Sequence, residues 1–243
     1  AWGDVARRIA HEIKNPLTPI QLSAERIKRK FISQVGHDAD KLEQMTDVIV
    51  RQTNDLRRIV DEFSKFARMP EPELHLNDMT QLVHDALSLQ IVGQPDVHFA
   101  ANIPEEAVLV DIDDTMIGQA LTNLLKNAGE ATETYINREA PEGYRPEVQL
   151  RMSYDAHNVT IKISDNGIGL PEDRARLFEP YVTTRGEGTG LGLPIVKKII
   201  EEHGGTLTLT DAEVFAGHTH AGACAIIQLP AAVQAARAPK IPA

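Results

Sequence analysis

Apolar residues recur in steps of three and four along the first 66 residues of the chain, in two series separated by Gly36. The first series is Val5, Ile9, Ile13, Leu17, Ile20, Ala24, Ile27 and Phe31. The second is Leu42, Met45, Ile49, Gln52, Leu56, Ile59, Phe63 and Phe66, in which Gln52 is the single polar member. This spacing is typical of helices that pack along a coiled-coil seam. The pattern predicts two long helices joined by a short loop into an antiparallel hairpin.

A single hairpin of this kind cannot bury its whole apolar seam by itself. Two hairpins that pack into a four-helix bundle would bury it. We therefore expect a homodimer that forms through helices 1–31 and 40–69.

The pattern changes after "MPEPEL", where two prolines indicate a linker. Helices are expected at 77–92, at 114–134 and in "GLGLPIVKKIIEEHGG", and strands in "VHFAANI", "VLVDI", "EVQLRMSYD", "NVTIKISD", "TLTLTD" and "ACAIIQLP". This mixture predicts a two-layer α/β sandwich. The expected organisation is a helical domain at 1–69, a linker at 70–76, an α/β domain at 77–230 and a disordered tail at 231–243.

Composition narrows the possible partners. The net charge is −10 over 243 residues, which argues against binding to nucleic acid or to an anionic membrane surface.

Cys224 is the single cysteine, so an internal disulfide is excluded. No apolar run approaches about 18 residues, the length that spans a membrane. The chain begins in the middle of a helical pattern, and we expect it to be a piece of a longer protein.

Two glycine-rich segments suggest a phosphate site. "DNGIGLP" (165–171) follows a predicted strand, and "GEGTGLGL" (186–193) opens a predicted helix. The N-terminus of a helix offers free N–H groups and a positive dipole end to phosphate. Neither segment fits a Walker A loop or a dinucleotide fingerprint.

A third segment, "LTNLLKNAGEA", places Asn123 and Asn127 four residues apart and hence on one helix face. Carboxamide oxygens suit a hard cation such as Mg²⁺. An isolated pair of asparagines is more often solvated or capping. The order of the segments decides between these readings: the asparagine pair, Asp-Asn-Gly-x-Gly, Phe-Glu-Pro and then Gly-x-Gly-x-Gly-Leu are very unlikely to occur together by chance.

In this order the sequence resembles the two-component sensor histidine kinases over nearly all of residues 1–230. "HEIKNPLTP" is similar to the phosphoacceptor box, "NLLKNAGEA" to the N box, "DNGIGLP" to the first glycine box, "FEPYVTTR" to the F box and "GTGLGL" to the second glycine box. Two segments further resemble the NtrY-type nitrogen-regulation sensor kinases in sequence, "DVARRIAHEIKNPLTPIQLSAERIKRK" and "VDEFSKFARMPEPEL".

The resemblance implies a dimerisation and phosphotransfer domain followed by an ATP-binding domain of the gyrase/Hsp90/histidine kinase/MutL type. It also implies that the chain is the cytoplasmic portion of an inner-membrane sensor. Asp165 would accept a hydrogen bond from the adenine amino group, and Asn127, with Asn123 beside it, would hold Mg²⁺. The other residues implied at the ATP site are Lys126, Gly167, Gly169, Phe178, Thr183, Thr184, Arg185, Gly188, Thr189, Gly190, Leu191, Gly192 and Leu193.

Two positions bear on the reaction. Hydrolases of this superfamily carry a glutamate as general base one turn before the metal-binding asparagine, where this chain has Asn123. A carboxamide cannot take a proton from water, so the resemblance favours transfer to a side chain. Many histidine kinases also carry a basic residue where this chain has Glu130, and Lys126 or Arg185 would have to supply the positive charge.

The resemblance makes His11 the phosphoacceptor. His11 lies two residues after the seam residue Ile9, roughly 200° around the helix, so it is expected to face solvent. Glu12 would accept the proton as the bond to phosphorus forms. Asn15, on the same face, would orient the water that dephosphorylates the partner, the receiver domain of an NtrX-like response regulator.

Pro16 is expected to lie inside a continuous helix and to act as a hinge beside His11. Two rival functions stay open: an ATPase or ATP-driven clamp of the same superfamily, and a dimeric scaffold that binds ATP and has no kinase activity. "HTH" (218–220) is only a weak indication of a metal site, because no further ligand accompanies it.

Overall fold

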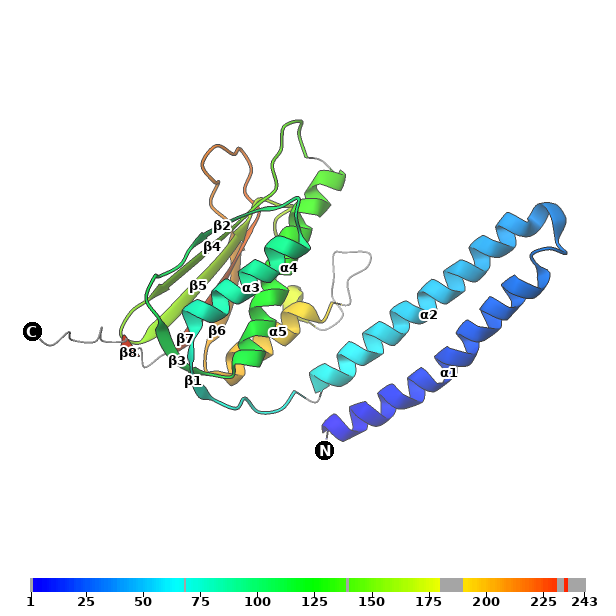
Figure 1. Cartoon of the computed structure of the whole chain (residues 1–243), viewed down its shortest axis with the longest axis horizontal. Coiled ribbons are helices and arrows are strands. Elements are labelled where there is room, and N and C mark those ends of the chain that lie inside the picture. Colours follow the sequence, from blue (N-terminus) through cyan, green and yellow to red (C-terminus); the bar gives the residue numbers. More distant parts are fainter. Residues whose placement is uncertain (1, 68, 139, 180–189, 231–233, 236–243) are drawn as a thin grey trace, which may run out of the picture. The chain divides into compact units, whose positions relative to one another are not determined.

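The computed structural model describes residues 2–67, 69–138, 140–179, 190–230 and 234–235. Two compact units make up the chain, the first ending at Pro70 and the second beginning at Glu71 (Figure 1). Among the described residues, Gly190 and Leu191 are grouped with the first unit, and the second unit resumes at Gly192. Thr183, Thr184, Arg185, Gly188 and Thr189, predicted at the ATP site, lie outside the described residues. No helix in the described ranges is both long and apolar enough to cross a bilayer.

The first unit is an antiparallel hairpin of two long helices. α1 (Trp2–Phe31) and α2 (Ala39–Ala67) are joined by a short turn with a 3₁₀ helix, Gly36–Asp38. Gly36 has a φ of 57°, the left-handed conformation that glycine adopts at little cost. The predicted hairpin and its break at Gly36 are confirmed.

Small residues dominate the buried contact of the hairpin. On α1 the buried residues are Ala10, Leu17 and Ala24, seven apart, and on α2 Thr46, Thr53 and Val60 repeat the same interval. The hydroxyl groups of Thr46 and Thr53 donate to carbonyl groups one turn earlier in their own helix, so they are satisfied without leaving the contact.

Most of the larger apolar residues of the predicted seam are exposed within one chain. They include Ile9, Ile13, Ile20, Ile27 and Phe31 on α1, and Met45, Ile49 and Leu56 on α2, with exposed fractions from 37 to 62%. The hairpin therefore has one closed face of small residues and a second, apolar face that it does not cover itself.

The second unit is built on a five-stranded sheet. Its strand order is β2 (His98–Asn102), β4 (Glu147–Tyr154), β5 (Asn158–Asp165), β7 (Ala223–Pro230) and β6 (Thr206–Asp211). Only β2 and β4 pair in parallel. Helices α3 (Met79–Gly93), α4 (Asp114–Arg138) and α5 (Gly192–Glu202) cover one face of this sheet (Figure 1). This is the predicted two-layer sandwich.

Alternation along the central strands builds the core. Val159, Ile161 and Ile163 of β5 are buried, and the residues between them are at least partly exposed. The same alternation continues to Asp165, which is also buried. The strand therefore carries a carboxylate to the helix-covered side of the sheet at its final position.

Two short strands correct the sequence analysis. β1 (His75–Asp78) and β8 (Gln234–Ala235) both pair with β3 (Val108–Ile112) in a second, three-stranded sheet. The predicted linker 70–76 and disordered tail 231–243 were wrong for these residues. These sequences are too short to show a strand period, and they become strands because each edge of β3 has backbone N–H and C=O groups that need a partner.

The residue before α4 fixes the start of that helix. Asp113 accepts hydrogen bonds from the N–H of Met116 (3.0 Å) and from the N–H of Glu73 (3.1 Å). Its own N–H donates to Nε2 of His203, which follows α5 (3.1 Å). Burial raises the pKa of Asp113, but these backbone donors and His203 outweigh it and leave the pKa below its usual value. The cap therefore ties α4 to neighbouring segments of the unit.

Candidate functional site

Helix α4 presents the two predicted asparagines on its less buried side. Asn123 and Asn127 are partly exposed, whereas Leu121, Leu124, Leu125 and Ala128 are buried, as the spacing predicted. A Cβ atom placed on Gly192 would lie 3.8 Å from Nδ2 of Asn127. Asn127 therefore lies beside the first residue of α5, where free N–H groups favour an anion.

Asp165 ends β5 with its carboxylate held by backbone donors. Its Oδ1 accepts from the N–H of Gly167 (2.8 Å) and from the N–H of Ala223 (3.2 Å). The Asp165 carbonyl accepts from the N–H of Gly222 (3.0 Å). Donors from its own turn and from the adjacent strand thus fix this acidic group in a buried position.

The glycine turn after Asp165 packs against α4 with no room for a side chain. A Cβ atom on Gly167 would lie 2.6 Å from both the carbonyl oxygen of Ala131 and the nitrogen of Thr132. The next residue, Ile168, donates its N–H to the same Ala131 carbonyl (3.1 Å). Gly169 has a φ of 78° and lets the chain turn away. The first glycine box thus brings Asp165 to the helix that carries Asn127.

Gly222 is a residue of this site that the sequence analysis missed. A Cβ atom there would lie 2.6 Å from the nitrogen of Gly167 and even closer to Oδ1 of Asp165. The only signal in the sequence is a glycine placed directly before the last long strand, which is too common to be specific.

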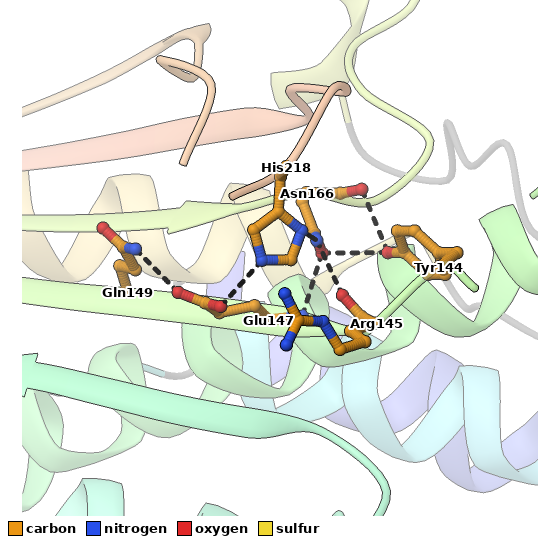
Figure 2. A network of polar contacts seen from close by, with 6 residues as sticks. All are labelled: Tyr144, Arg145, Glu147, Gln149, Asn166 and His218. Carbon is orange, nitrogen blue, oxygen red and sulfur yellow. Dashed lines mark hydrogen bonds and ion pairs between the residues drawn. The ribbon is translucent and has the colours of Figure 1, made fainter. Parts of the chain in front are cut away.

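A polar network surrounds Asn166, the residue between Asp165 and Gly167 (Figure 2). Its Oδ1 accepts from the Tyr144 hydroxyl (2.9 Å) and from the N–H of Glu147 (2.9 Å), and its Nδ2 donates to the Arg145 carbonyl (2.8 Å). Nδ2 also lies 3.1 Å from Nδ1 of His218. Asn166 is buried, and both ends of its amide group form hydrogen bonds, so its side chain holds the turn to the start of β4.

Tyr144 stays a donor in this network. Burial raises the pKa of the Tyr144 hydroxyl above its usual range, and the charges of Asp165 and Tyr135 raise it further. The Tyr144 ring also meets the Tyr135 ring of α4 edge to face, with centroids 5.0 Å apart.

The second glycine box leads into α5. Gly190, with a φ of 69°, and Leu191 directly precede the helix, and Gly192 and Leu193 are its first residues. Phe178 ends a short 3₁₀ helix, Ala175–Phe178, and its ring lies 4.8 Å from Nζ of Lys197 on α5. The structure thus brings Phe178 to α5 and adds Lys197, which the sequence analysis did not single out.

Lys126, one of the two residues expected to supply positive charge at the phosphates, pairs with a carboxylate of its own helix in this structure. Nζ of Lys126 lies 3.7 Å from a carboxylate oxygen of Glu130, one turn along the exposed side of α4. Arg185, the other predicted source of charge, lies outside the described residues.

In the helical unit, His11, Glu12 and Asn15 are all exposed on α1. His11 faces solvent as predicted, directly after buried Ala10. Glu12 forms an exposed pair with Arg8 at 3.3 Å. α1 continues through Pro16 and Pro19, also as predicted.

The two units match two family models in this order. Residues 1–72 match the "His Kinase A (phospho-acceptor) domain", and residues 112–233 match the "Histidine kinase-, DNA gyrase B-, and HSP90-like ATPase". The chain belongs to the histidine kinase family. Its ATP-binding domain is the unit that holds Asp165 and Asn127, and its phosphoacceptor domain is the hairpin that holds His11.

Relatives of this histidine kinase include a nitrogen regulation protein and a sensor histidine kinase. It is 53% identical to the nitrogen regulation protein NtrY of Azorhizobium caulinodans over 215 residues, which is 87% of this chain and 27% of that protein. It is 31% identical to the sensor histidine kinase ZraS of Escherichia coli K12, over 88% of this chain and 43% of ZraS. The chain thus spans less than half of these relatives.

Solved structures share both units of this histidine kinase. The kinase ThkA, solved in complex with the response regulator TrrA, aligns over 94% of this chain and 61% of that one, with a TM-score of 0.59 and 26% identity. Full-length ShkA with AMPPNP aligns over 97% of this chain and 47% of that one, with a TM-score of 0.64, and at 23% identity it supports the fold alone.

Proposed function

We propose that the chain is the catalytic core of a sensor kinase that transfers the γ-phosphoryl group of ATP to His11 and then to an aspartate of a response-regulator receiver domain. The observation that carries this proposal is the separation of two chemistries: one unit exposes a histidine, and the other holds a fixed carboxylate, two asparagines and a helix N-terminus around one glycine turn.

In the ATP site, the carboxylate of Asp165 recognises the adenine amino group and the first turn of α5 receives the phosphates. Asn127, with Asn123 beside it, would hold Mg²⁺, which neutralises charge on the transferring phosphoryl group when it is bound. The fit rests on donor chemistry: carboxamide oxygens, which suit a hard cation, lie beside a helix start that favours phosphate.

In the transfer step, an unprotonated imidazole nitrogen of His11 attacks the γ-phosphorus. The bond from that phosphorus to the β,γ-bridging oxygen breaks, and ADP leaves with the electron pair. The imidazole proton passes to Glu12, and the phosphoryl group stays on His11. In the opposing regulatory reaction, the dephosphorylation of the response regulator, Asn15 orients the water that attacks the phosphorylated aspartate.

The proposed assembly is a homodimer through helices 1–31 and 40–69. The apolar face that the hairpin leaves exposed supports it, because a second copy would bury Ile13, Ile20 and Ile27. We further propose that the chain is the cytoplasmic part of an inner-membrane sensor and that an NtrX-like response regulator is its partner. The identity to NtrY supports both proposals.

The experiment that tests the kinase proposal is incubation with γ-labelled ATP and Mg²⁺. We expect acid-labile, base-stable label on the wild-type protein and on His37→Gln, a control at an exposed histidine of the same unit, and none on His11→Gln. His11→Gln should still bind ATP. Label on His11→Gln would refute the assignment, steady phosphate release without labelled protein would indicate an ATPase, and ATP binding with neither would indicate a scaffold.

The metal proposal has its own test. Asn127→Ala should lose most of its affinity for Mg-ATP in a calorimetric titration. Asn137→Ala, at an exposed position near the end of the same helix, should bind as the wild type does. An unchanged affinity in Asn127→Ala would contradict the role of Asn127.

A further inference from the structure

The segment between β6 and β7 sends two histidines to two consecutive residues of the glycine turn. His218 contacts the side chain of Asn166, and His220 contacts the backbone of Gly167. Both contacted residues directly follow Asp165. The segment also ends in Gly222 and Ala223, whose N–H groups bond to Asp165 itself.

His220 links the turn to α4. Its Nε2 donates to the Gly167 carbonyl (2.8 Å), since a carbonyl can only accept. Its ring stacks on Tyr135 of α4, with centroids 4.2 Å apart and planes 6° from parallel. One side chain therefore sets the position of Gly167 relative to the helix that carries the asparagine pair.

His218 links the turn to β4. The amide of Asn166 can point only one way, because its Oδ1 faces the N–H of Glu147 and its Nδ2 faces the carbonyl of Arg145. Nδ1 of His218 must then accept from Nδ2 of Asn166, and Nε2 donates to a carboxylate oxygen of Glu147 (3.0 Å) (Figure 2). Gln149 holds the other oxygen of Glu147 at 2.7 Å.

These contacts fix the turn from two directions. The pairing of β5 with β4 ends at Asp165, and beyond it the backbone of the turn is held by the N–H of Asn166 on the Glu147 carbonyl (3.2 Å) and by the N–H of Ile168 on the Ala131 carbonyl (3.1 Å). His218 restrains Asn166 and His220 restrains Gly167, whose N–H orients the Asp165 carboxylate. A turn that lost these restraints could shift although β5 stayed in register.

We propose that His218 and His220 are positioning residues for adenine recognition: they hold the glycine turn so that the Asp165 carboxylate meets the 6-amino group of the base. The inference rests on the proposed role of Asp165 in ATP binding. It assigns to the "HTH" segment a part in base selectivity, which the two histidines exert through the glycine turn.

The test compares ATP with purine riboside triphosphate, which lacks the 6-amino group. His220→Phe keeps an aromatic ring for Tyr135 and removes the donor to Gly167, whereas His220→Gln can place a donor nitrogen where Nε2 lies. His84→Phe, at an exposed position of α3, is the matched control. Dissociation constants for both nucleotides are measured by calorimetry, and thermal melting checks that each variant is folded.

We expect His220→Phe to bind ATP roughly three- to tenfold more weakly, the effect of about one hydrogen bond, and the analogue as the wild type does. The rate of His11 phosphorylation at saturating ATP should not change. His220→Gln and His84→Phe should behave as the wild type, and His218→Phe should follow His220→Phe.

Equal losses for ATP and the analogue in His220→Phe would overturn the proposal, because they would indicate general damage to the site. Wild-type affinity for ATP in both His220→Phe and His218→Phe would overturn it as well. If the wild-type protein itself bound the two nucleotides equally, the adenine role of Asp165 would fail and the inference with it, so the two failures are distinguishable.

Discussion

Replacement of Gly167 by alanine is the sharpest test of how the ATP site is built. The added methyl group has no space, because its carbon would lie 2.6 Å from the Ala131 carbonyl oxygen and from the nitrogen of Thr132. Both atoms belong to the backbone of α4, which cannot rotate away as a side chain could. The glycine turn must therefore move off the helix.

The size of the movement follows from these distances. Carbon needs a separation of about 3.5 Å from a neighbouring heavy atom, so the turn has to move by about 1 Å. That shift stretches the Ile168–Ala131 hydrogen bond from 3.1 Å past its useful range and displaces the N–H that orients Asp165. Strain of this kind costs about 1–3 kcal/mol and the lost bond about 1 kcal/mol more. A misplacement of about 1 Å can lower activity a hundredfold.

The assay is ATP affinity by calorimetry, with thermal melting in parallel. We expect Gly167→Ala to fold with a lowered melting temperature and to bind ATP roughly ten- to hundredfold more weakly, the effect of losing one hydrogen bond to a charged group. Gly93→Ala is the matched control, because a Cβ atom there meets nothing within 4 Å at the end of α3. ATP binding by Gly167→Ala within threefold of the wild type would refute the close approach of turn and helix as the reason for this glycine.

Three further predictions concern the cap, the dimer and the hinge. Asp113→Ala should lower the free energy of unfolding by about 1–2 kcal/mol in chemical denaturation at pH 7, whereas Asp113→Asn, which keeps an acceptor, should lose less. Because the folded-state pKa of Asp113 lies below its ordinary value of 3.8, the ionic part of this stabilisation is complete above that value and is lost as the pH falls through the folded-state pKa. Ile20→Glu, on the exposed apolar face of α1, should convert a dimer into a monomer in light scattering, and an unchanged mass would contradict the proposed interface. Pro16→Ala should shift the ratio of kinase to phosphatase activity, and equal rates in both assays would reduce the proline to a tolerated residue.

The sequence predicted most of the second unit because its long strands and helices have clear periods. The alternation in β5 and the buried side of α4 both appear in the structure as expected. Four ordered motifs also placed Asp165 and Asn127 on neighbouring segments. What the pattern could not predict depends on contacts between distant segments: β1 and β8 form only beside β3, and Gly222 is required only because Asp165 occupies the space next to it.

The two histidines show the same limit in a functional site. A His-x-His in an irregular segment has no helical or strand period, and at the sequence level its only chemical interpretation was a weak metal site. In the structure each ring nitrogen of His218 faces a partner of defined polarity. Those partners lie 71 and 52 residues away in the sequence, so no local pattern could indicate them.

The hairpin explains why one regular series of apolar residues can serve two contacts. Ala10, Ile13, Leu17, Ile20, Ala24 and Ile27 follow one another in alternating steps of three and four, which the sequence alone presents as a single seam. In the structure every second member, from Ala10 to Ala24, is buried against α2, and Ile13, Ile20 and Ile27 stay exposed. The two alanines of the first stripe let the helices of one chain approach closely, and the isoleucines of the second keep apolar area for another copy. His11 lies on neither stripe, so a dimer formed through the isoleucines could bury its apolar face and still leave the phosphoacceptor open to ATP and to a receiver domain.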